Sequence, residues 1–254
     1  VLRGPEPTLS YSAISTYREC PLQYWYRYRL RLPAPPTVEA QLGTIVHEAI
    51  ASAGRRRRDG ASLGEASLLA MYEDAWEAVA FVDPRRRPVL EALGWRWVRD
   101  LWARGELEAA PAFVEEPFTV PLEGWTLRGI IDRVEPIPGR EAWRIVDFKS
   151  GRPLPTTELR RDLQLALYAL GARRGLALGS RGAEDLDGDT LELEIRYLRG
   201  GEGVRLAPDD RLLERAEAAG RDVADKVRQG RFEARPTVRR CRLCAYRLAC
   251  PSGQ

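Results

Sequence analysis

The segments GIIDRV, at residues 129–134, and RIVDFK, at residues 144–149, decide how this chain folds. Both are rich in β-branched and aromatic residues, and the intervening IPGREA contains the proline and glycine of a tight turn. We therefore predict a hairpin made of two strands, Trp125–Val134 and Trp143–Phe148. The apolar positions of the hairpin are suited to a buried sheet.

Each strand of this hairpin carries an acidic residue. Side chains alternate between the two faces of a strand, so Asp147 and Lys149 point to one face and Phe148 to the other. The hairpin turn brings Asp132 close to Asp147. Two carboxylates at the ends of apolar strands are poor core residues unless something compensates them. Mg²⁺ does so, because it prefers oxygen ligands and often binds one or two carboxylates together with a substrate phosphate.

This combination of residues suggests phosphoryl chemistry. A divalent cation polarises a phosphoryl oxygen and lowers the pKa of a bound water. Lys149 could then orient or deprotonate that water, or stabilise the developing negative charge. The alternative is a surface hairpin with an ordinary salt bridge, because the sequence D-x-K is common by itself.

The rest of the chain predicts a mixed α/β core. Alternating apolar residues at 118–122 and 190–198 indicate one strand before the hairpin and one after it. Helical periodicity is found in four stretches. They lie at 42–53, 62–110, 157–175 and 208–230, and residues 55–60 between the first two read as a polar loop.

Length and composition fit an ordinary globular protein of 254 residues with its own core. The net charge of +3 is weak evidence for any partner, but nearly all positive charge is arginine, with Lys149 and Lys226 as the only lysines. Arginine binds phosphate through paired hydrogen bonds, although a thermophilic or GC-rich source explains the bias equally well. The chain shows neither a membrane-spanning run nor a signal peptide, so we expect a cytoplasmic protein without a membrane partner.

Four cysteines form a candidate metal site. Three of them, Cys241, Cys244 and Cys250, lie within ten residues, and Cys20 is near the other end of the chain. Clustered cysteines in a chain without a secretory signal bind a metal more often than they form disulfides. Four thiolates suit either zinc or a [4Fe–4S] cluster, and spacing favours neither.

Taken together, the motifs of the chain resemble the PD-(D/E)xK nuclease superfamily and, within it, the RecB/AddB-like iron–sulfur nuclease domains. The matching stretches are LSYSAISTYRECPLQYWY at 9–26, GTIVHEAI at 43–50, the two hairpin segments, QLALY at 164–168 and CRLCAYRLACP at 241–251. They follow one another in a single order over most of the chain, whereas residues 55–112 carry no motif.

The resemblance implies a restriction-endonuclease-like mixed sheet flanked by helices, with a helical N-terminal insertion and a four-cysteine [4Fe–4S] cluster, or alternatively zinc, joining the two ends. It implies His47, Asp132, Asp147 and the Phe148 carbonyl as ligands of Mg²⁺ or Mn²⁺, with Lys149 catalytic. Glu116 occupies the place of a further acid, an assignment weakened by its neighbour Glu115. Because imidazole suits Mn²⁺ better than Mg²⁺, we expect higher activity with Mn²⁺.

The QLALY helix is a further candidate for the active site. Gln164 and Tyr168 lie four residues apart and therefore share one face of the helix, where they could support catalysis. Arg160 and Arg161 lie one turn earlier and could bind a DNA phosphate. The alternative is an amphipathic helix that only packs against the core. Both can be true, because the apolar residues and the pair Gln164 and Tyr168 lie on opposite faces of the helix.

A run of aromatic and arginine residues near the N-terminus could bind single-stranded DNA. Aromatic rings stack on unpaired bases and arginine meets phosphates, which makes Tyr24 and Arg27 candidates. The alternative is packing against the cysteine site.

The sequence therefore predicts a metal-dependent nuclease that cuts single-stranded DNA in repair or recombination, either as part of a helicase–nuclease or as a stand-alone exonuclease. The alternatives are a CRISPR-associated iron–sulfur exonuclease and a catalytically inactive DNA-binding module. We expect one domain over 1–254, divided into N-terminal helices at 1–54, a helical insertion at 55–112, the nuclease core at 113–230 and a cluster-binding segment at 231–254.

Overall fold

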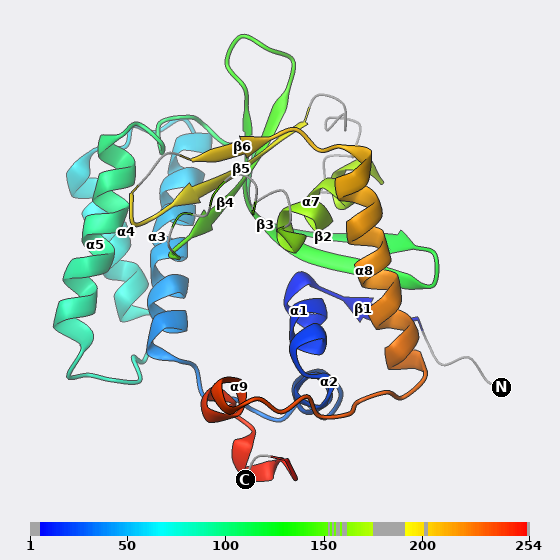
Figure 1. Ribbon diagram of the computed structural model, residues 1–254. Helices are drawn as coiled ribbons and strands as arrows, with labels where there is room; N and C mark the ends of the chain where they lie inside the picture. Colours follow the sequence, from blue (N-terminus) through cyan, green and yellow to red (C-terminus); the bar gives the residue numbers. More distant parts are fainter. Residues whose placement is uncertain are drawn as a thin grey trace.

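The computed structural model describes residues 6–151, 153, 155, 158, 162–174, 191–200 and 203–252. The elements follow one another along the chain as labelled in Figure 1. They are β1 (Thr8–Leu9), α1 (Tyr11–Glu19), α2 (Pro21–Tyr24), the π-helix η1 (Trp25–Arg29), α3 (Val38–Arg58), α4 (Glu65–Glu77), α5 (Arg87–Ala103), β2 (Phe113–Leu122), β3 (Trp125–Pro136), β4 (Trp143–Lys149), α7 (Leu163–Arg173), β5 (Leu191–Tyr197), β6 (Val204–Leu206), α8 (Asp210–Arg228), α9 (Val238–Leu243) and the 3₁₀ helix η4 (Arg247–Ala249).

A mixed six-stranded sheet forms the centre of the fold (Figure 1). Strand β3 pairs antiparallel with β2 along one edge. Along the other edge it pairs in parallel with β1 near its start and antiparallel with β4 near its end. Strand β4 continues in parallel to β5, and β5 runs antiparallel to β6. The predicted hairpin and the mixed α/β class are therefore confirmed.

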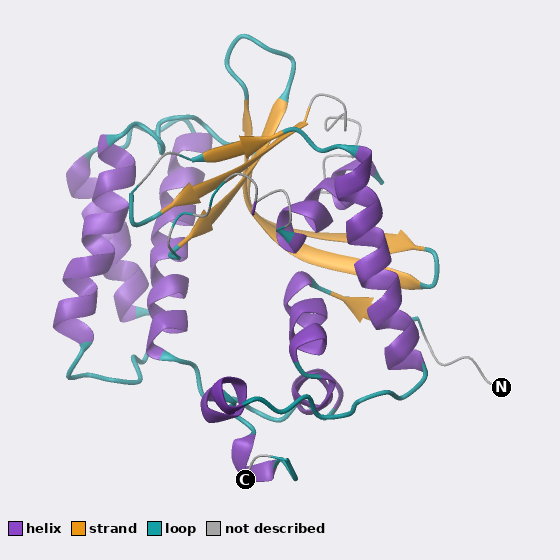
Figure 2. Ribbon diagram, in the orientation of Figure 1, coloured by secondary structure: helices purple, strands orange, loops and turns teal. Residues whose placement is uncertain are grey.

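Two groups of helices cover the two faces of the sheet (Figure 2). Helices α3, α4 and α5 pack on one face, where Val146 and Phe148 of β4 join their apolar core. Helices α1, α7 and α8 pack on the other face, where Ile145 of β4 belongs to a second core. Consecutive residues of β4 thus enter different cores, because side chains alternate between the two faces of a strand.

Close backbone contact fixes helix α8 on β3. A Cβ atom at Gly220 of α8 would lie 2.2 Å from the ring of Trp125, so only glycine permits this approach. Trp125 is 1% exposed and fills the space beneath the helix. The position of α8 over β3 therefore depends on one residue without a side chain.

Capping side chains explain where two helices begin. Helix α3 was expected at 42–53 but begins at Val38, because the Thr37 hydroxyl accepts a 3.1 Å hydrogen bond from the Ala40 amide. It continues to Arg58, so most of the predicted polar loop at 55–60 is its last turn. Helix α7 begins after Asp162, whose carboxylate accepts a 3.0 Å hydrogen bond from the Leu165 amide.

None of the helices in the described part of the chain has the length and apolarity needed to span a membrane.

Candidate metal centre

Two acidic residues face each other across strands β2 and β3. The neighbouring pairs Val114–Arg133 and Glu116–Ile131 place Glu115 opposite Asp132. Like charges directly opposite each other destabilise a sheet. Glu115 also has a φ of +49°, in the left-handed region that residues other than glycine rarely adopt. Such a local departure from regular backbone is typical of a functional site.

The repulsion between these acids changes the pKa of the Glu115 carboxyl. Burial, followed by the negative charges of Asp132 and Glu48, raises the pKa of Glu115 to about 7. The positive charge of Arg55 acts in the opposite direction but does not outweigh burial and the two acids.

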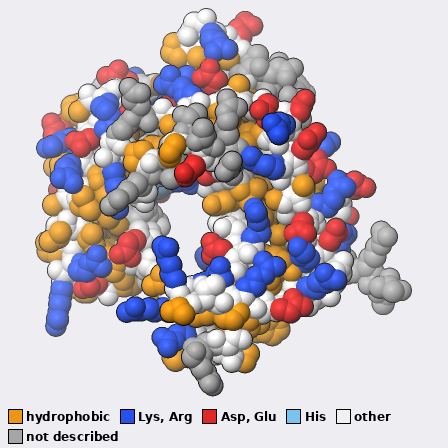
Figure 3. All heavy atoms as spheres, viewed as in Figure 1, with side chains coloured by type: hydrophobic (Ala, Val, Ile, Leu, Met, Phe, Trp, Pro, Cys, Tyr) orange, Lys and Arg blue, Asp and Glu red, His pale blue; other side chains and the backbone are white. Residues whose placement is uncertain are grey.

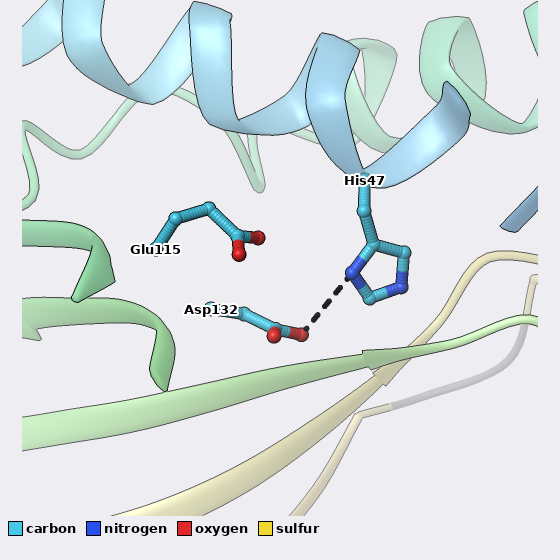
Figure 4. Close-up of side chains that lie close together, drawn as sticks. All are labelled: His47, Glu115 and Asp132. Atoms are coloured by element: carbon cyan, nitrogen blue, oxygen red, sulfur yellow. Dashed lines mark ion pairs between the residues drawn. The ribbon is translucent and has the colours of Figure 1, made fainter. Parts of the chain in front are cut away.

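His47 of helix α3 completes a group of three ligands, which point toward one another in Figure 4. Its Nδ1 lies 3.5 Å from Asp132 Oδ2, and one ligand atom from each of His47, Glu115 and Asp132 lies within 4.8 Å of the others. The Phe148 amide donates a 2.9 Å hydrogen bond to Asp132 Oδ2, and the Phe148 ring packs against the imidazole. Helix α3, strand β2 and the hairpin β3–β4 therefore each contribute to the site.

A second group of polar side chains lies on β4 and α7 beside these ligands. Lys149 Nζ lies 2.8 Å from Asp147 Oδ2 and donates a 2.6 Å hydrogen bond to Gln164 Oε1. The Gln164 amide nitrogen donates to Asp147 Oδ1 at 2.7 Å and to the Tyr168 hydroxyl at 2.9 Å, and this hydroxyl donates to the Ile130 carbonyl. The predicted face of Gln164 and Tyr168 thus holds Asp147 and Lys149 in place.

Burial and charge set the protonation of this group. Burial, followed by the negative charge of Asp132, raises the pKa of Asp147 to about 7. Burial works against the charged form of Lys149, but the facing carboxylates, with Asp147 first, outweigh it and raise its pKa. Lys149 is therefore a cation next to acids that repel one another.

The residues present fit a divalent cation. Asp147 is 1% exposed, and burial and the nearby charge of Asp132 disfavour its charged form although Lys149 Nζ lies 2.8 Å from its Oδ2. Buried carboxylates held close to one another are costly, and a bound cation would relieve that cost. The set of one imidazole and the carboxylates of Glu115 and Asp132 is consistent with such an ion, and the imidazole is better suited to Mn²⁺ than to Mg²⁺.

One predicted ligand needs correction. Glu116 was expected as the further acid, but the structure places its neighbour Glu115 beside His47 and Asp132. Glu115 and not Glu116 lies opposite Asp132 in the antiparallel register of β2 and β3. The left-handed backbone at Glu115 has no signal in the sequence.

The predicted DNA contacts have different outcomes. Tyr24 is 4% exposed and packs against the rings of Tyr17 and Phe232, so it offers no free face to a DNA base. It belongs to the hydrophobic core and is not among the residues that line the cysteine pocket. Arg27 is exposed and lies over the ring of its neighbour Tyr28. The predicted residues Arg160 and Arg161 lie outside the described residues.

All four cysteines line one pocket where the two ends of the chain meet, at the bottom of Figure 1. The pocket is lined by Cys20, Cys241, Cys244 and Cys250 together with Tyr26 and Tyr246. The thiols are free, and no three of these described sulfur atoms form a group within 4.8 Å. A bound cluster is thus not shown.

Protein hydrogen bonds nevertheless join the two ends. The Tyr26 hydroxyl donates to the Ala249 carbonyl at 2.9 Å, and the Tyr246 hydroxyl donates to the Leu32 carbonyl at 3.1 Å. The segment from Tyr26 to Leu32 and the C-terminal segment therefore lie against each other.

An opening passes through the molecule in Figure 3. In the same orientation, Figure 1 places α3 on one side of it, α1 on the other, the sheet above, and α2 and α9 below. The elements that carry the metal ligands, α3 and the strands of the sheet, thus border this opening. It is closed on the lower side by the joined ends of the chain.

A mixed sheet between two helical layers, with opposed acids, an imidazole and a nearby ion-paired lysine, fits the class of nucleases. The sequence model of the PD-(D/E)XK nuclease superfamily matches residues 8–251, and the chain belongs to that superfamily.

Individual relatives are distant. The Gene 69 protein of Mycobacterium phage L5 is 26% identical over 152 residues, which make up 58% of this chain and 47% of that protein. The chain therefore matches about half the length of this relative. A solved structure from Eubacterium rectale, provisionally named an exonuclease, has a TM-score of 0.51 at 17% identity, covering 93% of this chain and 85% of that one. This likeness concerns the fold alone.

Proposed function

We propose that the protein is a metal-dependent deoxyribonuclease that hydrolyses the phosphodiester bonds of single-stranded DNA. The observation that carries the proposal is the convergence of His47, Glu115 and Asp132 within 4.8 Å, next to the buried Asp147–Lys149 pair. A bound Mg²⁺ or Mn²⁺ would supply Lewis-acid activation of the phosphate and lower the pKa of water.

The protein's own residues have separate roles in this proposal. His47, Glu115 and Asp132 would hold the cation, with Asp147 of the neighbouring strand as a further ligand. Lys149 remains charged, so it would stabilise the negative charge that develops on the phosphate as water attacks. Gln164 fixes Lys149 and Asp147 relative to each other through hydrogen bonds of 2.6 and 2.7 Å. Gln164 is thus a positioning residue, and Tyr168 fixes it in turn.

The opening through the molecule supports a single-stranded substrate and an exonuclease mode. A strand that passes through a closed opening must enter by a free end, so a linear single strand is a better substrate than a circular one. Arg27, which is exposed on η1, would contact phosphates along the way.

We further propose that the four-cysteine pocket holds a [4Fe–4S] cluster, with zinc as the alternative. Its support is the position of all four thiols around one pocket at the junction of the chain ends. Burial, and then the nearby thiols of Cys20, Cys250 and Cys241, raise the pKa of Cys244, so the four sulfur atoms lie close enough to affect one another. Anaerobically purified protein should contain about four irons per chain and absorb in the visible range. Stoichiometric zinc without iron would support the alternative.

The biological setting is proposed from the same chemistry. Cutting single strands from an end suits DNA repair or recombination in the cytoplasm, either next to a helicase or as a stand-alone enzyme. A CRISPR-associated exonuclease would have the same chemistry and different partners. Co-purification with a helicase or with adaptation proteins would distinguish these settings.

The test compares wild-type protein with Asp147→Asn on end-labelled linear single strands, circular single strands and duplexes. We expect cleavage of the linear single strand with Mn²⁺ or Mg²⁺, none in EDTA, and near-complete loss in Asp147→Asn with an unchanged circular dichroism spectrum. Asp59→Asn, an exposed position at the end of α3, is the control and should retain full activity. A wild-type protein loaded with its cluster that cuts no DNA would instead indicate an inactive DNA-binding module.

A further inference from the structure

A groove of about 530 Å³ adjoins the metal centre. Its volume is within the range of about 300–1,000 Å³ typical of small-molecule sites. The groove lies between the β2–β3 ribbon, helix α7 and the beginning of α1. Asp132, Gln164 and Tyr168 line it as well as the metal centre, so the two sites are continuous.

The floor of the groove is a row of three residues on β3. Asp132, Ile130 and Arg128 alternate along the strand and therefore project from the same face. Ile130 is 53% exposed, which is unusual for an isoleucine in the middle of a sheet. Arg128 is also exposed. The row thus begins with a metal ligand, continues with an open apolar side chain and ends with a cation.

The walls of the groove offer aromatic and apolar surface together with hydroxyl groups. Tyr11, the first residue of α1, and Leu167 of α7 both line it. Burial raises the pKa of Tyr11, so its hydroxyl stays protonated and can donate a hydrogen bond. Ser12 adds a further hydroxyl at the rim. Apolar faces with polar edges match a nucleobase better than they match a peptide or a lipid chain.

We propose that this groove binds the nucleoside next to the scissile phosphate, and that Arg128 binds the following phosphate. The inference rests on the proposed nuclease function and adds a substrate subsite to it. Asp132 and Arg128 are four positions apart along the strand, a distance of about 13 Å. One phosphate cannot reach both positions, so Arg128 contacts a different phosphate from the one cleaved. Ile130 and Tyr11 contact the base between them.

The phosphate contact is tested by DNA binding without cleavage. Fluorescence anisotropy of a labelled single strand is measured in EDTA over a series of salt concentrations. We expect Arg128→Gln to weaken binding about three- to tenfold and to reduce the magnitude of the slope of log K against log salt by about 0.7. The control is Arg99→Gln, at an exposed arginine of α5 on the other side of the sheet, which should bind like wild type.

The base contact is tested by cleavage of strands that carry one abasic nucleotide at successive positions. Loss of a stacked base costs affinity, so the wild-type ladder of products should show about tenfold slower cleavage at the bond flanking the abasic nucleotide. Ile130→Thr, which keeps the branched shape, should cut intact strands with a higher KM and show a much weaker pause. Val89→Thr, at an apolar residue of α5 that is 73% exposed, should retain the full pause.

The outcomes separate the two levels of the proposal. If the wild-type protein neither binds nor cuts single strands, the proposed function fails and this subsite with it. If the wild type is active but Arg128→Gln and Ile130→Thr behave like their controls, only the subsite is refuted. Thermal melts of each variant establish that a loss does not come from unfolding.

Discussion

Neutralising Glu115 should stabilise the metal-free protein while it removes the response to metal. In Glu115→Gln the negative charge opposite Asp132 disappears, and a side chain of the same shape remains. The pKa of Glu115, raised from 4.5 to about 7, measures how strongly the folded state disfavours its charge. A divalent cation would relieve the same repulsion between Glu115 and Asp132. The Glu115 carboxylate therefore lowers the stability of the metal-free protein and favours metal binding.

The magnitude follows from the pKa. At about 1.4 kcal/mol per pH unit, a rise from 4.5 to about 7 sets an upper limit of about 3.5 kcal/mol. Glu115 is partly exposed, and screening by water reduces this to about 1–2 kcal/mol. For a chain of this size, that corresponds to a rise in Tm of about 3–6 °C.

The sign of the pH dependence is fixed by the direction of the shift. The folded state binds the proton of Glu115 more tightly than the unfolded state, so wild-type stability from this group is full below about pH 4.5 and falls as the pH rises toward 7. The advantage of Glu115→Gln should therefore be complete at pH 8 and mostly absent at pH 5.

The assay is a thermal melt in EDTA and in Mn²⁺, at pH 5 and pH 8. Mn²⁺ should raise the Tm of the wild type at pH 8 and have little effect on Glu115→Gln. Glu116→Gln is the matched control, because it removes the same charge from the next residue of β2 and should change neither Tm nor the response to Mn²⁺. A less stable Glu115→Gln at pH 8, or an equal gain at both pH values, would refute the reasoning.

Two further predictions concern packing and buried charge, and each has its own control. Gly220→Ala should lower the free energy of unfolding by about 1–3 kcal/mol in a urea titration, because its Cβ would lie 2.2 Å from the Trp125 ring; Gly43→Ala, with nothing within 4 Å, should gain up to about 1 kcal/mol. Arg196→Met should cost about 2–3 kcal/mol, because it removes one ion pair each from the buried Glu135 and Glu194, which keep Arg133 and Arg144 as partners. Its control, Arg205→Met, removes a guanidinium that also pairs with Glu194 but is 58% exposed, and should cost less than about 1 kcal/mol. Equal effects within either pair would contradict the corresponding argument.

The fold was predictable where local signals and the period of the side chains agree. The hairpin of β3 and β4 follows from alternating apolar residues around a turn, and the positions of Asp147 and Lys149 on one face follow from the same period. Helix boundaries were less accurate: α3 begins at Val38, directly after its cap Thr37, and not at residue 42. The positions of α4 and α5 depend on tertiary packing and carry no motif.

The candidate site was predictable except where it depends on backbone geometry. His47 and Asp132 lie 85 positions apart and could be joined only through the family resemblance. Glu115 was overlooked because its role depends on a left-handed φ and on the register of β2, which the sequence does not specify. Tyr24 was misassigned because an aromatic residue suited to stacking on a base is equally suited to a core.

A network of buried ion pairs lies on the same strands as the opposed acids Glu115 and Asp132. Arg133 follows Asp132 directly and points to the opposite face, where it pairs with Glu135 at 2.9 Å and hydrogen-bonds to the Ala109 carbonyl. Arg196 of β5 pairs with the same Glu135 and donates to the Glu106 carbonyl at 2.9 Å.

These two carbonyls belong to the segment between α5 and β2, so the network holds the approach to the strand on which Glu115 lies. Residues 132 and 133 point to opposite faces of β3. The Asp132 carboxylate, which repels Glu115, and the ion pair of Arg133 with Glu135 therefore lie on the same short stretch of backbone. If this coupling holds, Arg196→Met should weaken Mn²⁺ binding, measured by calorimetry, as well as stability. An unchanged Mn²⁺ affinity in the folded Arg196→Met protein would show that the two faces of the sheet are independent.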